Sequence, residues 1–244
     1  MFRKHRHLLL LSALTLLAGR ASGGPPFKTD DPEPVDFRHW EFYLASVSQF
    51  GRSASEGTLP HLEINYGAAP NLQLHLIAPM GFVRGEGGTA YGFGATELGA
   101  KYRFAEESDS SPQIGVFPLV ELPIAPTSSL DQGNVQAYLP LWVQKSWGKF
   151  TTYGGAGYWI DSGQGNRNWI FAGWQAQYDF SETVSLGGEV FYGSAQTQGG
   201  SGGAGFNLGG FINITEHDHI LFSAGHSVQG EAQTTAYLGF QLTI

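Results

Sequence analysis

From His39 to the last residue, apolar residues alternate with polar or small ones. Successive side chains of a β-strand point to opposite faces, so a period of two predicts strands with one apolar face. The pattern is clearest at 72–78, 206–214 and 238–244. No stretch places its apolar residues at helical spacing over three turns. The alternation therefore predicts an all-β fold over residues 39–244.

Twelve strands account for the alternating region, and most have roughly the 10 residues that a tilted membrane-crossing strand needs. We expect them at 39–50, 58–67, 71–83, 91–104, 112–124, 134–146, 149–160, 168–180, 184–196, 204–215, 219–228 and 235–244. An even number of antiparallel strands brings both chain ends to the same side of a barrel.

The connections between these strands alternate in length. Tight turns are expected at 67–71, 147–149, 179–183 and 215–219, and looser Gly/Ser/Gln-rich links at 125–133, 161–167 and 196–203. The link at 105–111 belongs to the tight-turn side but is longer than the other turns. Short turns at the periplasmic end and longer loops at the other end are typical of outer-membrane barrels.

Ionisable residues fall almost entirely opposite the apolar stripe of their strand. Those that do so are Glu41, His61, Glu63, His75, Glu97, Lys101, Arg103, Glu121 and Glu189. Lys145 and His226 depart from this rule, each at a strand end. A lipid-facing Lys or Arg near the bilayer midplane costs about 2–4 kcal/mol, so the parity fits a membrane barrel with a charged lumen. A soluble β-sandwich or barrel would show the same alternation with its apolar face inward.

Composition and aromatic positions favour the membrane alternative. Charged residues make up 14% of the chain, against roughly 25% in soluble domains. The aromatics nearest the strand ends are interpreted as girdles at the two lipid–water boundaries. They are Trp40, Trp147, Tyr158, Trp159, Trp169 and Tyr178. The last strand, 237–244, resembles the signal that the barrel-assembly machinery recognises, although it ends in Ile244 rather than an aromatic. We therefore expect an antiparallel transmembrane β-barrel in the lipids of the outer membrane.

The first 23 residues predict a cleavable signal peptide. A basic stretch at 1–7 precedes an apolar run at 8–18 and small residues up to Gly23. The apolar run is shorter than the roughly 20 residues that a helix needs to cross a bilayer. Without this leader the chain keeps all 21 acidic residues and a formal charge near −12, which argues against a nucleic-acid partner. The absence of cysteine excludes disulfides and thiolate chemistry.

Residues 24–38 contain four prolines and four acids. Because proline has no amide donor, this stretch predicts an extended segment outside the β-ladder, located in the periplasm. Together with His39-Trp40-Glu41-Phe42-Tyr43, it resembles the opening of the phenol-degradation meta-pathway family of bacterial outer-membrane proteins, often described as transporters. The resemblance implies a small channel-like barrel for aromatic or other hydrophobic compounds, with no defined binding residues.

The inward charges are the main candidate site. Eight residues are predicted to line the lumen or permeation path: Glu41, Glu63, His75, Glu97, Lys101, Arg103, Glu121 and Glu189. In one interpretation these charges set the selectivity of a channel for a small-molecule solute. In the other they form a salt-bridged filling that blocks flow, since a barrel of this size can be filled or open. A non-conducting barrel would then contact envelope partners through residues 24–38 and its loops.

Other motifs are weaker, and the sequence predicts no cofactor, no metal and no catalytic residue. A lipid-modifying enzyme would need a nucleophile and a base, and the nearest pair is His226-Ser227. Adjacent strand residues point to opposite faces, so these two side chains cannot meet. The turn at 216–219, Glu-His-Asp-His, would hold a divalent metal only weakly, and the Gly-rich stretch 199–203 is expected to be a plain loop.

Overall fold

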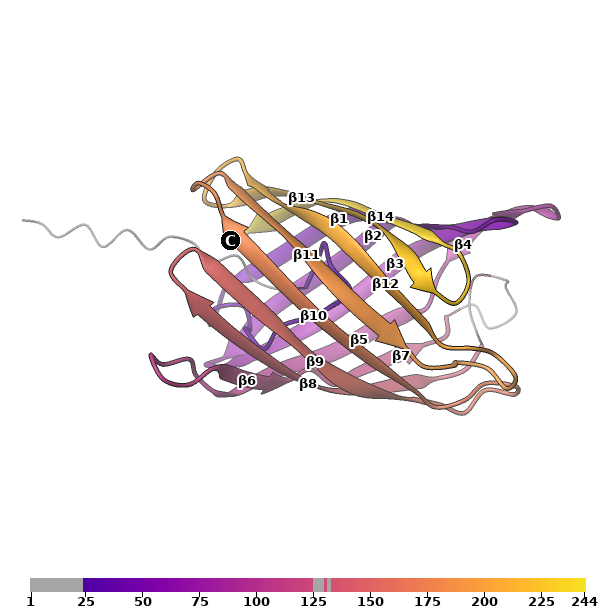
Figure 1. Cartoon of the computed structure of the whole chain (residues 1–244), viewed down its shortest axis with the longest axis horizontal. Coiled ribbons are helices and arrows are strands. Elements are labelled where there is room, and N and C mark those ends of the chain that lie inside the picture. The colour runs from indigo at the N-terminus through magenta and orange to yellow at the C-terminus, as the bar shows by residue number, and fades with distance from the viewer. Residues whose placement is uncertain (1–23, 125–129, 131–132) are drawn as a thin grey trace, which may run out of the picture.

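The computed structural model describes residues 24–124, 130 and 133–244. The predicted signal peptide, 1–23, and most of the predicted 125–133 link lie outside the described residues. In the described part every regular element is a β-strand, and these strands form a tilted barrel (Figure 1). This part holds no helix that is long and apolar enough to cross a membrane.

The strands follow the predicted order, most of them within a few residues of the predicted bounds. They are β1 Trp40–Phe50, β2 Ala54–Ala69, β3 Leu72–Gly85, β4 Gly88–Phe93, β5 Thr96–Ala105, β6 Gln113–Val116, β7 Leu119–Leu122, β8 Gln136–Trp147, β9 Phe150–Asp161, β10 Trp169–Asp179, β11 Val184–Gly193, β12 Gly203–Asn213, β13 Asp218–Gln229 and β14 Thr234–Thr243. Each pairs antiparallel with its neighbours, and β1 pairs with β14. The sheet therefore closes on itself, which removes the exposed edges that invite aggregation.

Two of the barrel strands are interrupted. The strands β4 and β5 both pair with β3 and are separated by a break at Gly94. The strands β6 and β7 both pair with β5 and β8 and are separated at Phe117 and Pro118, where proline cannot donate to the ladder. Counted this way, the described residues form the twelve-stranded antiparallel barrel that the sequence predicted.

The two ends of the barrel differ, as the sequence predicted. The tight turns after β2, β8, β10 and β12 lie at the same end as the link between β5 and β6 (Figure 1). That end also holds the start of β1 and the C-terminus, where Trp40 and Ile244 exchange backbone hydrogen bonds. We call it the turn end, and the opposite one, with the longer links and the protruding β3–β4 hairpin, the loop end (Figure 1).

The outer face is apolar and the inner face is polar. Leu208, Leu238 and Val190 are each more than 60% exposed on the outside. On the inside, Gln175 and Lys101 are at most 3% exposed. This arrangement is the reverse of a soluble barrel and matches a barrel whose wall faces lipid. The outward apolar face therefore excludes the soluble β-sandwich or barrel that alternation alone left open.

Candidate functional site

Residues 24–38 lie inside the barrel, and we call them the inner segment. Thr29 and Asp31 in it are fully buried. The segment is hydrogen-bonded to β13 through Ser223, to β11 through Glu189 and to β5 through Lys101. Because β5 and β11 are separated by several strands around the barrel in either direction, the segment must cross the lumen.

The predicted periplasmic location of residues 24–38 is therefore wrong. Proline does keep the segment out of the ladder, apart from a single bridge between Phe37 and Gly67. What holds it in the lumen is its acids and backbone amides, which find charged partners on distant strands. Those partners lie up to 161 residues away in the chain. A local pattern carries no information about such pairs.

Glu189 on β11 receives four hydrogen bonds. One carboxylate oxygen accepts from the backbone N–H of Lys28 at 2.8 Å and from the Asn207 amide at 2.6 Å. The other accepts from the Thr29 N–H at 2.7 Å and from the Thr29 hydroxyl at 2.6 Å. Bonds to an ionised acceptor are about twice as strong as neutral ones, so Glu189 is a major attachment point of the inner segment.

A glycine in the wall makes this attachment possible. The Thr29 side chain lies directly against Gly173 of β10, and a Cβ at that position would be 3.1 Å from the Thr29 Cβ and in collision with its hydroxyl. Any larger residue at 173 would push the inner segment away from the wall. The close approach therefore requires glycine there.

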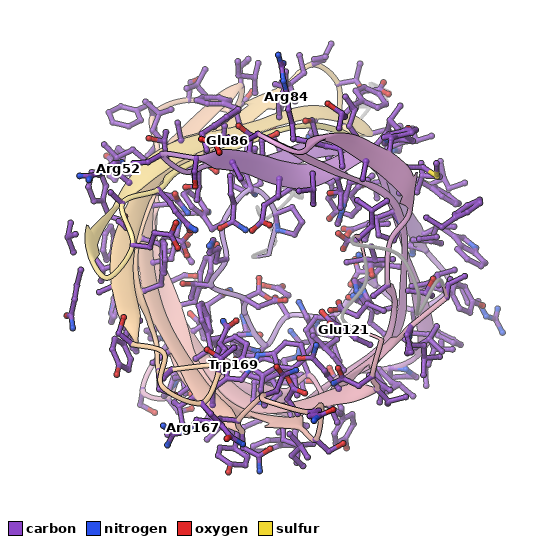
Figure 2. All side chains as sticks on the ribbon, turned by 90° about the vertical axis from the view of Figure 1, so that its right-hand side faces the viewer. Arg52, Arg84, Glu86, Glu121, Arg167 and Trp169 are labelled. Carbon is purple, nitrogen blue, oxygen red and sulfur yellow. The ribbon has the colours of Figure 1, made fainter. Side chains whose placement is uncertain are left out.

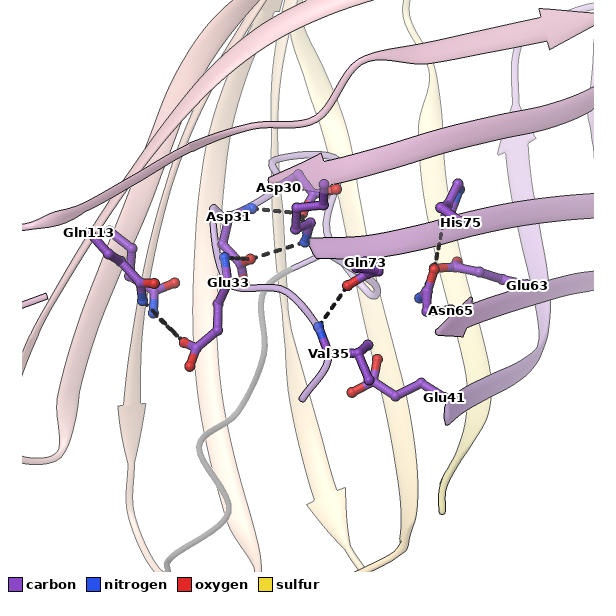
Figure 3. Close-up of polar contacts among 12 residues, drawn as sticks. Asp30, Asp31, Glu33, Val35, Glu41, Glu63, Asn65, Gln73, His75 and Gln113 are labelled. Carbon is purple, nitrogen blue, oxygen red and sulfur yellow. Dashed lines mark hydrogen bonds and ion pairs between the residues drawn. The ribbon is translucent and has the colours of Figure 1, made fainter. Parts of the chain in front are cut away.

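On the opposite side, Lys101 of β5 holds two consecutive acids of the inner segment. Its ammonium lies 2.8 Å from Asp30 Oδ1 and 3.1 Å from Asp31 Oδ1 (Figure 3). Burial, which outweighs the nearby Lys101 charge, raises the pKa of Asp31 to about 7. Two acids sharing one buried lysine give the segment a second strong attachment, and removing the lysine would leave the acids without a counter-charge.

Weaker polar contacts fix the rest of the segment near the turn end. Glu33 accepts from the amides of Gln113 and Gln144 at 3.1 and 3.0 Å. The Val35 N–H donates to Gln73 at 2.9 Å (Figure 3). The segment is thus bonded along its length and not only at one point.

A buried histidine cluster lies in the wall close to these contacts. His75 Nδ1 is 2.7 Å from Asn65 and 3.6 Å from Glu63 (Figure 3). Its Nε2 is 2.9 Å from Glu97. Glu41 accepts a 2.7 Å hydrogen bond from the Tyr43 hydroxyl. These side chains come from neighbouring strands, β1, β2, β3 and β5, on one side of the lumen.

The predicted lumen residues all lie on the inner face. Five are mostly buried, namely Glu41, Glu63, His75, Lys101 and Glu189. Glu121 is paired across the sheet with Glu97, and both it and Trp169 lie on the inner side of the barrel in the view along its axis (Figure 2). Lys101 pairs with Asp30 and Asp31 of the inner segment, and Arg103 donates to Asn71 and Gln113.

Aromatic rings gather in the lumen on the loop-end side of the inner segment. They border a cavity of about 190 Å³ that also contacts Lys28 and Asp30. The lining residues of the wall are Phe117, Leu119, Tyr138, Trp142, Trp159, Trp169 and Phe171. Tyr138, Trp159 and Trp169 stack in a row, with ring centroids 4.7 and 5.4 Å apart. Gly155 and Gly157 leave the space that the rings of Trp142 and Tyr138 occupy against β9.

This cavity corrects part of the girdle interpretation. Trp40, Trp147, Tyr158 and Tyr178 are exposed on the outer face, as a girdle requires. Trp159 and Trp169 instead face the lumen. The reason is parity: Trp159 follows the outward Tyr158 in the same strand, so the two rings must point to opposite faces.

The remaining motifs form no reactive site. His226 Nδ1 lies 3.1 Å from the Thr234 hydroxyl, whereas the Ser227 hydroxyl donates to the Glu231 carbonyl. The structure thus does not bring this pair together. In the described part of the chain no group of three or more His, Asp or Glu side chains could hold a metal ion. His219 of the 216–219 turn lies beside Asn213 instead.

Comparison with known proteins identifies the fold. No protein-family model matches the chain, and no curated protein matches its sequence. An outer membrane channel from Pseudomonas putida F1 superimposes with a TM-score of 0.71 over 88% of this chain and 98% of the other, at 15% identity. The KdgM porin reaches 0.59 at 13% identity, over 83% and 98%. The CymD monoaromatic hydrocarbon channel reaches 0.50 at 10% identity, over 85% and 89%. The fold is that of an outer-membrane β-barrel.

Proposed function

We propose that the chain is an outer-membrane channel for small compounds, narrowed by its inner segment. The observation that carries the proposal is the charged lumen enclosed by an apolar wall and crossed by residues 24–38. Charges and ordered polar groups along a lumen set which solutes pass. The similarity in fold to channels and porins also supports a channel. So does the resemblance of the opening residues to the phenol-degradation meta-pathway family.

The eight inward residues have distinct roles in this proposal. Lys101 and Glu189 hold the inner segment across the lumen, and the His75 cluster lines the path beside it. The outer apolar side chains contact outer-membrane lipids. The last strand, β14, carries the signal read by the barrel-assembly machinery, and residues 1–23 direct export. The turn end then faces the periplasm.

A non-conducting barrel is the second candidate, and the inner segment itself favours it. Its attachment to both sides of the lumen is what a permanent filling would need. The same attachment argues against residues 24–38 as a docking site for envelope partners, because Thr29 and Asp31 at its centre are fully buried. Partners of such a barrel would have to meet the loops.

Bilayer recordings on the refolded mature chain separate the two candidates. We expect small, stepwise conductance increments, and swelling of liposomes in small solutes but not in large sugars, because the inner segment leaves only part of the lumen free. Heat-modifiable gel migration of the same sample verifies that the barrel is folded. A folded sample that stays sealed to ions and solutes in every condition would exclude the channel and leave the second candidate.

A further inference from the structure

The aromatic cavity has the size of one substituted ring. An apolar cavity of about 150 Å³ accommodates benzene, and the volume here is about 190 Å³. Aromatic groups favour offset stacked or edge-to-face contacts at centroid separations of about 4.5–7 Å. The rings of Phe117, Tyr138, Trp159 and Phe171 supply faces and edges from different strands. A flat ring is therefore the shape that this lining fits best.

The cavity also carries a positive charge, that of the Lys28 ammonium. Lys28 extends from the inner segment into the lumen, where its side chain is exposed and its ammonium lies 4.7 Å from the centre of the Phe191 ring. Phe191 lies beside Phe171 of the lining, with ring centroids 6.4 Å apart. Within the described residues no carboxylate is within ion-pair distance of this ammonium. Glu189 attracts this ammonium through space, but its oxygens are hydrogen-bonded to backbone, hydroxyl and amide donors and not to the ammonium.

The other groups at the cavity are consistent with an anionic ligand. Asp30 is its one lining acid, and its Oδ1 lies 2.8 Å from the Lys101 ammonium, which Asp31 shares. The Trp142 indole N–H and the Tyr138 hydroxyl are buried in the lining without a hydrogen-bond partner. An unpaired buried donor is unfavourable, and an acceptor in the cavity would satisfy it.

We propose that this cavity binds a single-ring aromatic carboxylate, with the ring among Phe171, Tyr138 and Trp159 and the carboxylate on Lys28. The proposal deepens the proposed function by naming a substrate class for the channel, and in its transport role it rests on that function. The cavity lies between the inner segment and the loop end. A solute entering from that end would therefore reach this site before the inner segment.

Equilibrium binding to the refolded mature chain in detergent tests the proposal, with calorimetry and tryptophan fluorescence as readouts. The probes are benzoate, neutral benzyl alcohol, cyclohexanecarboxylate, which has the charge without the aromatic ring, and benzyltrimethylammonium. We expect benzoate to bind most tightly. Lys28→Met should weaken benzoate about tenfold and leave benzyl alcohol within twofold, because it removes one charge-assisted contact. Lys149→Met, at an exposed turn, is the matched control and should change neither.

A second variant tests the ring contacts independently of the charge. Phe171→Leu keeps an apolar side chain but removes an aromatic face, and should reduce the preference for benzoate over cyclohexanecarboxylate. Tighter binding of the ring cation than of benzoate would overturn the proposal, as would equal affinities for benzoate and cyclohexanecarboxylate. Conductance without benzoate binding would refute this site alone. Benzoate binding in a sealed barrel would refute the channel and leave the site standing.

Discussion

Deleting residues 25–36 from the mature chain should raise its single-channel conductance several-fold. The deletion removes backbone and side chains that cross the lumen from β11 to β5. The barrel itself should still close, because β1 begins at Trp40 and pairs with β2 and β14 independently of the inner segment. Bilayer recording measures the conductance, and heat-modifiable migration reports whether the barrel has formed.

A deletion elsewhere in the chain is the control for this experiment. Removing residues 199–202 shortens a Gly-rich link at the loop end and leaves the inner segment in place. That variant should conduct like the parent chain. If the folded 25–36 deletion also conducts like the parent, the inner segment does not narrow the lumen and the proposed role is wrong.

Glu189→Leu should detach the inner segment without shortening it. The substitution leaves the Lys28 and Thr29 amides, the Thr29 hydroxyl and the Asn207 amide without their acceptor. Each unpaired buried donor costs about 1–3 kcal/mol. A total of about 3 kcal/mol or more corresponds to at least a 100-fold shift toward the detached state.

Hydrogen exchange at the Thr29 amide and single-channel recording together measure this shift. Protection of that amide should fall by about the same factor, and the recording should show frequent transitions to a larger conductance. Glu189→Gln keeps an acceptor oxygen and should have a smaller effect, whereas Glu216→Gln in an exposed turn should have none. Unchanged Thr29 protection in Glu189→Leu would mean that the carboxylate does not hold the segment.

The sequence was enough to predict the barrel because its signal is local. Alternation places Glu189 and Lys101 on one face and Leu208 and Leu238 on the other, whatever lies further along the chain. The same parity also contained the information that Trp159 points inward, since Tyr153, Gly155 and Gly157 share its face. For assigning aromatics to the girdle, proximity to a strand end was a weaker criterion than parity along the strand.

The inner segment could not be predicted in this way. Its position depends on pairs such as Thr29 with Glu189, which are 160 residues apart, and Asp31 with Lys101, which are 70 apart. Acids and prolines in a row predict an extended, solvated stretch, and only the enclosed charges of the lumen give these acids partners. The aromatic cavity also depends on contacts between residues far apart in the chain, because Lys28 and Asp30 of that segment line it together with wall residues.

A reversible crosslink tests the central claim, that the inner segment controls the width of the lumen. The natural chain has no cysteine, so the double variant Thr29→Cys/Gly173→Cys contains a single possible disulfide. A Cβ at 173 would lie 3.1 Å from the Thr29 Cβ, so a small outward shift reaches the roughly 3.5–4.5 Å that a disulfide requires. Mass spectrometry establishes whether the bond has formed.

The measurement is single-channel conductance of this variant before and after reduction. Oxidised, the variant should conduct like the parent chain, because the segment is held against β10. Reduced, it should conduct several-fold more, because the new side chain at 173 displaces the segment and the Thr29 hydroxyl bond to Glu189 is gone. Equal conductance in the two states, with the disulfide verified, would contradict the claim.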